Sequence, residues 1–218
     1  KEWLTSNKPN WGSKWQAGDV KYKELTGEGE VTPGASTLEN HGDLKRIGNN
    51  SPRYRVGLNL DAAWKGIDFS IFFQGVLKRD WMFDAGDPYF WGAGSGMWQA
   101  ACFEEHMDYW TPENTDAYYP KPYFNETKNQ QAQDAYMQKA SYLRCKNIQL
   151  GYTLPTHITE KAGISNCRIY LSCDNLFTIT GLSSVYDPEA FGSYDGYGTS
   201  GKTYPLQRTI SVGVNLNF

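Results

Sequence analysis

The chain ends in the stretch RTISVGVNLNF, residues 208–218, in which apolar and polar side chains alternate up to the last residue. One face of an extended strand would carry Ile210, Val212, Val214, Leu216 and Phe218. An alternation of this kind predicts a half-buried β-strand. It runs from residue 210 to residue 218, close to the roughly 9–11 residues with which a tilted strand crosses a bilayer. The stretch therefore predicts a strand with one apolar and one polar face.

The overall composition excludes a helical membrane protein. The chain has 218 residues, a net charge of -3 and a mean hydropathy of -0.62, and no run approaches the ~18 apolar residues of a membrane helix. A transmembrane β-barrel remains consistent with these values, because its lumen-facing residues and long loops are polar. The near-neutral charge, without a stripe of Lys and Arg, indicates no nucleic-acid partner.

Four further segments have the composition of strands, namely residues 54–60, 67–76, 142–154 and 167–178. The connections alternate between short and long: a polar break at residues 61–66, a long loop at 77–140, a turn at 155–165 and a long loop at 179–206. Outer-membrane barrels have short turns on the periplasmic side and long loops outside. We therefore expect antiparallel strands in chain order, in a sheet that does not close on itself. A soluble β-sandwich would show the same alternation.

No motif in the sequence predicts catalysis or a metal site. The cysteines, Cys102, Cys145, Cys167 and Cys173, form no C-x-x-C pair, and the histidines are scattered. Simple alternation places Cys145 and Cys173 on opposite faces, so we expect free thiols there. GYGTSG, residues 196–201, fits a dinucleotide-binding pattern but lacks the strand and helix that such a site needs. Paired acids such as Glu104 and Glu105 are typical of solvated loops, and no catalytic residue is predicted.

Seven stretches, in this order, resemble the C-terminal part of SusC/RagA-type TonB-dependent outer-membrane transporters: GDVKYKELTGEGEVT (18–32), PRYRVGLNLDAAWKGIDFSIFFQGV (52–76), YWTPENTDAYYP (109–120), ASYLRCKNIQLGYTLP (140–155), RIYLSCDNLFTITG (168–181), YDPE (186–189) and YPLQRTISVGVNLNF (204–218). The family implies an all-β fold, a large plugged transmembrane barrel of about 22 antiparallel strands with long extracellular loops. Residues 1–53 would be an extracellular loop region preceding a barrel strand. Residues 54–218 would be strands and loops of one incomplete domain, with the plug N-terminal to Lys1.

The resemblance also implies a function. Transporters of this family import nutrients, here oligosaccharides or peptides, across the bacterial cell outer membrane, and TonB supplies the energy through the missing N-terminal part. A SusD-like surface lipoprotein would cover the outer loops, outer-membrane lipid would surround the barrel, and no enzymatic step would occur. Two alternatives remain open, a secreted β-sandwich carbohydrate-binding module and a passive porin.

Two outer loops contain the candidate substrate-binding residues. They are Trp81, Asp84, Asp87, Tyr89, Trp91 and Trp98 in the first loop, and Tyr186, Asp187, Tyr194, Asp195 and Tyr197 in the second. Aromatic faces stack on sugar rings or peptide side chains, and carboxylates accept hydrogen bonds from hydroxyl or amine groups. Membrane-interface girdles and packing between loops use the same residue types. At the C-terminus, Val214, Leu216 and Phe218 are similar to the signal that the barrel assembly machinery binds by edge pairing.

Residues 24–30, ELTGEGE, are similar to an acidic, calcium-loop-like segment of the family. Oxygen ligands at the first, third and fifth positions followed by Gly fit a Ca²⁺ loop. In this chain Glu stands where the shorter Asp carboxylates fit such a loop, and Thr26 is a weak neutral ligand. We therefore expect a plain turn, with no metal and no cofactor.

Overall fold

The computed structural model describes residues 9–12, 14–95, 101–124, 126–190 and 206–218. The chain divides into two compact units. The sheet unit comprises Asn49–Trp81, Gln138–Ala190 and Tyr204–Phe218, and the loop unit comprises Lys1–Gly48, Met82–Met137 and Phe191–Thr203. Because each unit is assembled from separate segments, the division differs from the sequence-based boundary at residue 54, which stays a prediction.

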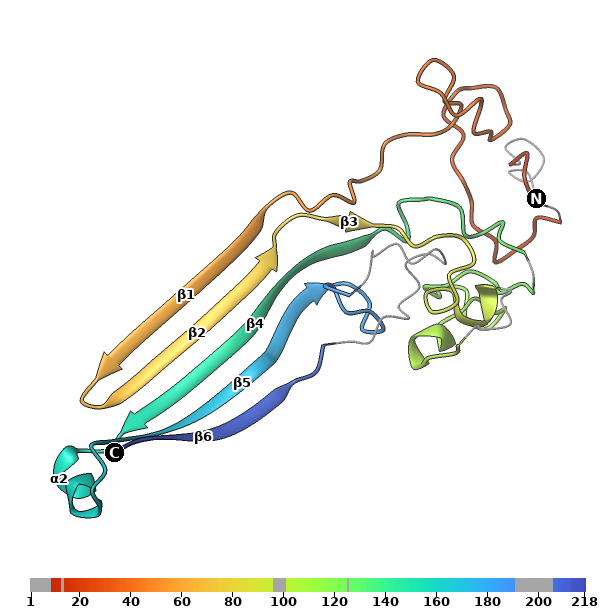
Figure 1. The fold of residues 1–218 in the computed structure, drawn as a ribbon. Helices are drawn as coiled ribbons and strands as arrows, with labels where there is room; N and C mark the ends of the chain where they lie inside the picture. The colour runs from red at the N-terminus through yellow and green to blue at the C-terminus, as the bar shows by residue number, and fades with distance from the viewer. Residues whose placement is uncertain (1–8, 13, 96–100, 125, 191–205) are drawn as a thin grey trace. The chain divides into compact units, whose positions relative to one another are not determined.

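The sheet unit is a single antiparallel sheet with the order β1-β2-β4-β5-β6, and the short β3 pairs with β4. The strands are β1 (Arg55–Trp64), β2 (Ile67–Val76), β3 (Asp80–Trp81), β4 (Gln138–Thr153), β5 (Asn166–Gly181) and β6 (Thr209–Asn217). Figure 1 shows these strands side by side in chain order, as an open sheet. The predicted antiparallel neighbours in chain order are therefore confirmed, and the sheet does not close on itself.

The β1–β2 connection is shorter than predicted. The expected polar break at residues 61–66 is wrong, because β1 continues to Trp64. Asp61 is a polar residue within the period-2 pattern and pairs with Ser70. Only Lys65 and Gly66 form the turn, with positive φ angles of 48° and 87°, as a two-residue hairpin of type I′ requires. The hydrogen bond from Thr153 N–H to the Gly66 carbonyl, at 2.7 Å, ties this turn to β4.

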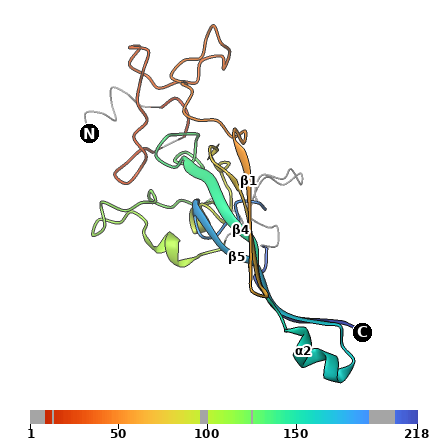
Figure 2. The same cartoon turned by 90° about the vertical axis from the view of Figure 1, so that its left-hand side faces the viewer.

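The second short connection contains one turn of helix, α2 (Thr156–Thr159), followed by a 3₁₀ helix, η3 (Glu160–Ala162). The 3₁₀ helix ends at Gly163, whose φ of 70° fits a left-handed C-cap. Figure 2 views the strands nearly edge-on and shows α2 and the C-terminus at the same end of the sheet. The two short connections and the chain terminus therefore share one end.

The register gives the sheet one apolar and one polar face. One row of partners that crosses all the long strands is Leu60, Ile71, Ile148, Cys173 and Ile210. The next row is Asp61, Ser70, Gln149, Ser172 and Ser211, and the row after it is Ala62, Phe69, Leu150, Leu171 and Val212. Because successive residues of a strand point to opposite faces, the first and third rows share the apolar face.

Cys145 and Cys173 lie on the same, apolar face, so the prediction of opposite faces is wrong. Cys145 pairs with Phe73 and Phe177, and the register shifts between Cys145 and Asn147. Lys146 is the extra residue of a β-bulge, and one extra residue inverts the alternation beyond it. The four cysteines are free thiols.

Gly213 leaves room on β6 for the ring of Tyr170, its partner on β5. A Cβ atom at residue 213 would lie 2.2 Å from Tyr170 Cζ, so Gly213→Ala forces the ring to move. Gly57 is the matched control, because its Cβ would meet Phe72 at an ordinary 3.5 Å. We expect Gly213→Ala to lower the free energy of unfolding by about 1–3 kcal/mol, and Gly57→Ala to change it by less than about 0.5 kcal/mol. Urea titration of the complete protein, in which heat-modifiable gel mobility detects the folded form, measures both changes in the free energy of unfolding. Equal changes in the two variants would contradict this packing.

The loop unit has little regular structure in its described part, with two 3₁₀ helices, η1 (Gly92–Ser95) and η2 (Glu104–Met107). Its core is aromatic. The ring centroids of Phe83 and Phe90 lie 4.8 Å apart, and those of Trp91 and Tyr136 lie 4.9 Å apart. Burial raises the pKa of Tyr119 and of Tyr136 in this cluster. Among the described residues, no helix has the length and apolar character needed to cross a membrane.

Candidate functional site

The apolar face of the sheet is exposed along its length. Its exposed side chains are Leu58, Leu60, Trp64, Ile67, Leu150, Tyr152, Ile169, Leu171, Phe177, Ile179, Ile210, Val212, Val214 and Leu216. On β6, Ile210 is 67% exposed and Val212 is 75% exposed. Contiguous apolar patches of this extent are rare on the surface of soluble monomers. This face is suited to contact with lipid.

Aromatic side chains gather at the end of the sheet that holds the short connections. Trp64, at the end of β1, lies in one row with Ile67 and Tyr152. The Lys65 ammonium lies 4.9 Å from the centroid of the Trp64 ring. Phe218 follows β6 at the same end and is 87% exposed. Aromatic rings flanked by Lys are typical of the membrane–water interface. The assembly role of Phe218, Leu216 and Val214 stays a prediction.

The opposite face carries charged side chains that bridge strands. Arg168 on β5 donates from Nε to Asp68 Oδ1 on β2 at 2.9 Å and from NH2 to Gln149 Oε1 on β4 at 3.0 Å. Gly151 on β4 makes this possible, because a Cβ there would lie 2.5 Å from Arg168 NH2. The bridge spans β2, β4 and β5, and polar side chains of this kind suit the lumen of a barrel.

A more deeply buried cluster of charged side chains fixes the loop that follows β5 against strand β4. The Arg144 guanidinium lies 2.8 Å from Asp187 Oδ1 and 3.5 Å from Glu189 Oε1. Lys146 Nζ lies 3.0 Å from Glu189 Oε2. The side chains of Arg144 and Asp187 are only 4% and 8% exposed. Arg144 also donates from Nε to Thr178 Oγ1 at 2.7 Å, so its charge binds two strands and the loop together.

The electrostatics of Asp187 agree with this arrangement. Burial alone would raise the pKa of its carboxyl group, but hydrogen bonds from the Glu189 N–H and from Arg144 outweigh burial and hold that pKa below its usual value. The other carboxylate oxygen accepts the Leu206 N–H at 3.2 Å. Asp187 therefore stays ionised and binds both the start of the loop and Leu206, which lies shortly before β6.

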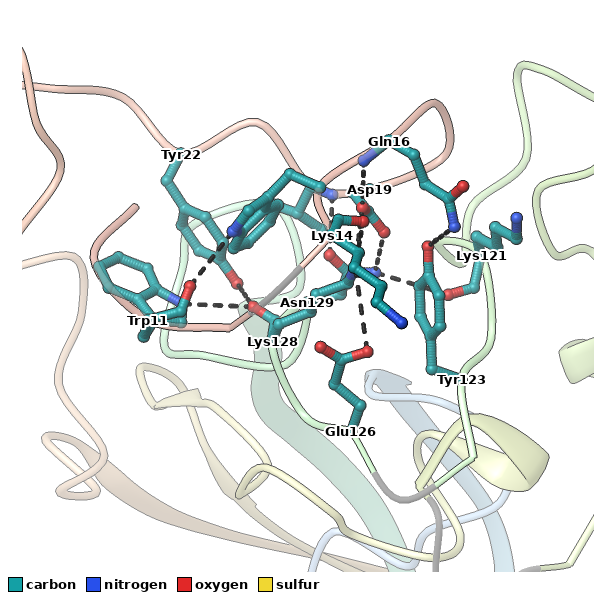
Figure 3. A network of polar contacts seen from close by, with 12 residues as sticks. Trp11, Lys14, Gln16, Asp19, Tyr22, Lys121, Tyr123, Glu126, Lys128 and Asn129 are labelled. Atoms are coloured by element: carbon teal, nitrogen blue, oxygen red, sulfur yellow. Dashed lines mark hydrogen bonds and ion pairs between the residues drawn. The ribbon is translucent and has the colours of Figure 1, made fainter. Parts of the chain in front are cut away.

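In the loop unit, a buried ion pair joins residues 14–22 to residues 121–129 (Figure 3). Lys128 Nζ lies 3.0 Å from Asp19 Oδ2, and the two side chains are 1% and 2% exposed. Asn129 completes the contact, because it donates to Asp19 Oδ1 at 3.0 Å and accepts the Val20 N–H at 3.0 Å. Neither charge is left unpaired, which is the condition for burying an ion pair without a large loss of stability.

Aromatic rings surround this ion pair (Figure 3). The centroid of the Tyr123 ring lies 4.0 Å from Lys128 Nζ, within the range of a cation–π contact. The Tyr22 hydroxyl donates to the Lys128 carbonyl at 2.9 Å. Burial raises the pKa of Tyr22, so this hydroxyl keeps its proton. The Lys121 N–H donates to the Gly18 carbonyl at 2.9 Å, and the network therefore fixes the backbone of Lys121.

A cavity of about 330 Å³ adjoins this network within the loop unit. Its wall includes Trp91, Tyr119, Pro120, Lys121, Pro122 and Tyr123. A second, more open hollow of about 520 Å³ contains Gln16 and Trp110 and shares Tyr109, Lys121 and Pro122 with the first. Concave sites of about 300–1,000 Å³ with mostly apolar walls are typical of ligand pockets. The cavity is a candidate ligand site.

The structure separates the predicted substrate-binding residues. Trp91 lines the cavity, and its indole N–H donates to the Asp84 carbonyl at 3.1 Å. Asp87 is buried and accepts the N–H groups of Tyr89 and Phe90. The ring of Tyr89 stacks on Phe103.

The other predicted residues lie elsewhere. Trp81 is in β3 of the sheet unit, with the Arg79 guanidinium 4.9 Å from its ring centroid. Tyr186 is buried next to Asp187 in the sheet unit. Trp98, Tyr194, Asp195 and Tyr197 are outside the described residues. The substrate contacts assigned to all these residues stay predictions.

Sequence reasoning missed most of the cavity wall and the Arg144 cluster. The segment YYPKPY, residues 118–123, alternates aromatic and proline residues around one lysine and could have indicated a rigid binding wall. Arg144 gave no such signal, because its partner Asp187 lies 43 residues further along the chain.

Glu24 organises a turn in the structure. Its Oε1 accepts hydrogen bonds from the Thr26 hydroxyl at 2.9 Å and from the Glu28 N–H at 3.0 Å. The hydroxyl and backbone hydrogen bonds hold its pKa below the usual value, although desolvation opposes this shift. Asp43 accepts N–H groups of the same turn, from Leu25 and Thr26. These carboxylates therefore already have partners, and the absence of bound calcium stays a prediction.

The sheet is open and antiparallel, with one exposed apolar face and one charged face, which is the pattern of strands in the wall of a membrane β-barrel. The chain is 29% identical to TonB-dependent receptor P3 of Formosa agariphila, over 92% of this chain and 19% of that receptor. It is 26% identical to TonB-dependent receptor P26 of the same organism, over 92% of this chain and 20% of that receptor. No family model matches the chain.

The chain is also similar to solved structures. The chain matches the RagAB peptide importer in the open-open state with a TM-score of 0.58 and 28% identity, over 78% of this chain and 17% of that one. It matches the RagAB peptide transporter with a TM-score of 0.54 and 31% identity, over 74% of this chain and 17% of that one. The resemblance to RagA-type TonB-dependent transporters is therefore confirmed. The chain spans 19% and 20% of the length of the two receptors.

Proposed function

We propose that this chain forms wall strands and outer loops of a TonB-dependent transporter in the outer membrane of a bacterium. The exposed apolar face of the sheet is the observation that carries this proposal, because it needs lipid to cover it. The names of the relatives, which are receptors and a peptide importer, support it. TonB would act through the plug that the family implies.

The transported substrate is an oligosaccharide or a peptide. The long connections, after β2 and after β5, leave the sheet at the end opposite the short ones, and they would form the outer vestibule. A SusD-like surface lipoprotein covers these loops and delivers substrate. The chain contributes binding and a passage but no covalent chemistry, and it needs neither metal nor cofactor.

Energy-dependent uptake tests the proposed function. We expect cells that express the complete protein to accumulate a labelled oligosaccharide or peptide mixture, and to lose this uptake when TonB is removed. The protein should fractionate with the outer membrane and require detergent for extraction. Uptake that persists without TonB would identify a passive porin. A complete protein that is monomeric in buffer without detergent would identify a secreted β-sandwich module.

A further inference from the structure

Cationic side chains gather at the end of the sheet where β1 begins, β2 ends and the long connections leave (Figure 1). Arg55 is the first residue of β1 and pairs with Val76, the last residue of β2. The two segments stay side by side beyond this pair, because the Arg53 N–H donates to the Lys78 carbonyl at 3.0 Å. Arg55 is an even number of residues from Asp61, so it lies on the polar face. Arg53 and Lys78 are each two residues beyond that pair and continue the same face. These three cations are called the cationic rim.

No ion pair offsets the charge of the cationic rim within the described residues. Arg53, Arg55 and Lys78 are exposed, and none of them forms an ion pair with a described carboxylate. The carboxylate of Asp80, which follows shortly after Lys78, accepts the Asn49 N–H at 3.1 Å. Like charges opposite one another on paired strands are destabilising. An anion bound beside Arg53 and Lys78 would relieve this repulsion.

Arg79 adds positive charge next to the cationic rim. Its Nε donates to the Asn50 carbonyl at 2.9 Å. Burial lowers the pKa of Arg79, and the nearby charge of Arg55 also lowers it. A guanidinium group nevertheless stays protonated at neutral pH. The positive charges of Arg55 and Arg79 therefore lie close together and raise the electrostatic potential at this end of the sheet.

The rest of the polar face carries no such excess of cations in the described residues. The Arg144 cluster holds two cations and two carboxylates. Arg168 is paired with Asp68. The remaining carboxylates, on Asp61 and Asp174, accept hydrogen bonds from neighbouring Asn side chains. The unpaired positive charge is therefore confined to the end of the polar face that the proposed function places at the outer mouth of the barrel.

We infer that the cationic rim binds an anionic group of the transported substrate, namely a carboxylate, sulfate or phosphate group. A cluster of cations raises the local concentration of anions, and Arg and Lys side chains select anions in membrane pores. Arg53 and Arg55 present planar guanidinium groups that can bind two oxygens of one anion, and Lys78 adds a point charge. The inference rests on the proposed function, because it specifies the charge of the substrate of that transporter.

Calorimetry on the complete protein in detergent tests the inference with two matched pairs of probes, tetraglutamate with tetraglutamine and tetragalacturonate with galactotetraose. We expect the anionic member of at least one pair to bind about ten-fold more tightly than its neutral analogue at low salt, as several exposed ion pairs together would give. The pair that shows this preference tells whether a peptide or an oligosaccharide carries the anion. In about 1 M NaCl the preference should fall to about two-fold or less, because salt screens exposed charges.

Three double variants assign the preference to the cationic rim. Arg55→Gln/Lys78→Gln should reduce it about three- to five-fold, because two exposed ion pairs are lost. Lys65→Gln/Lys161→Gln is the matched control, since it removes the same charge from exposed residues of the two short connections, and it should leave the preference unchanged. Arg55→Lys/Lys78→Arg keeps both charges and should retain most of the preference.

Heat-modifiable gel mobility confirms that each variant is folded before binding is measured. The inference is wrong if neither anionic probe binds more tightly than its neutral analogue. It is also wrong if Arg55→Gln/Lys78→Gln retains the full preference, or if Lys65→Gln/Lys161→Gln reduces it equally. TonB-dependent uptake of neutral substrates by the parent would leave the proposed function standing in each case.

Discussion

Deletion of Gly213 should nearly eliminate folded protein from the outer membrane. The deletion slips β6 by one residue against β5, where Val214 pairs with Ile169 and Leu216 with Cys167. A one-residue slip moves every later side chain to the opposite face. Asn215 and Asn217 would then lie on the apolar face.

Two point substitutions at the C-terminus, at the end of β6 and directly after it, serve as controls for the deletion. Phe218→Ala removes one interfacial ring, whose burial contributes about 1.5–3 kcal/mol at most. It should lower the amount of assembled protein, whereas the protein that does assemble should keep most of its stability. Asn217→Ala on the polar face should be mild. Heat-modifiable gel mobility and surface abundance measure all three variants. If all three assemble like the parent, β6 is not the lipid-facing assembly strand.

Arg144→Met should destabilise the complete protein by about 3–5 kcal/mol, because it leaves the buried Asp187 carboxylate without its cation. Asp187 and Glu189 both face Arg144, and the Asp187 side chain is only 8% exposed. Arg168→Met is the matched control. The Arg168–Asp68 pair is 22% and 36% exposed, and exposed pairs contribute about 0–1 kcal/mol.

Thermal unfolding of the two variants in detergent measures the difference. The loop after β5 should also become sensitive to proteolysis in Arg144→Met, because Asp187 fastens that loop through the Leu206 N–H as well. Equal losses of stability in Arg144→Met and Arg168→Met would contradict the assignment of Arg144 as the anchor of this loop.

The sequence predicted the sheet well where the period of two is regular. β6 and β2 follow their apolar alternation, and the short and long connections gave the correct order of strands. The prediction was wrong at Asp61, because this polar residue lies on the polar face within β1 and does not mark the end of the strand. It was also wrong at Cys145, because the bulge at Lys146 inserts one residue without any change in composition.

The candidate sites depend on contacts between distant residues, which local patterns do not contain. Lys128 meets Asp19 and Arg144 meets Asp187 only after the chain has folded. The cavity is similar, because its wall joins Trp91 to Tyr119 and Gln130, which lie far from Trp91 in the sequence.

The outer edges of β1 and β6 carry backbone N–H and C=O groups that no strand pairs within the described residues. In hydrocarbon each such group costs several kcal/mol if it stays without a hydrogen bond. The sheet alone is therefore unstable in a bilayer, even though its apolar side chains suit contact with lipid. Its backbone requires a neighbouring strand on each side. The stability of this segment therefore depends on the complete ring of strands.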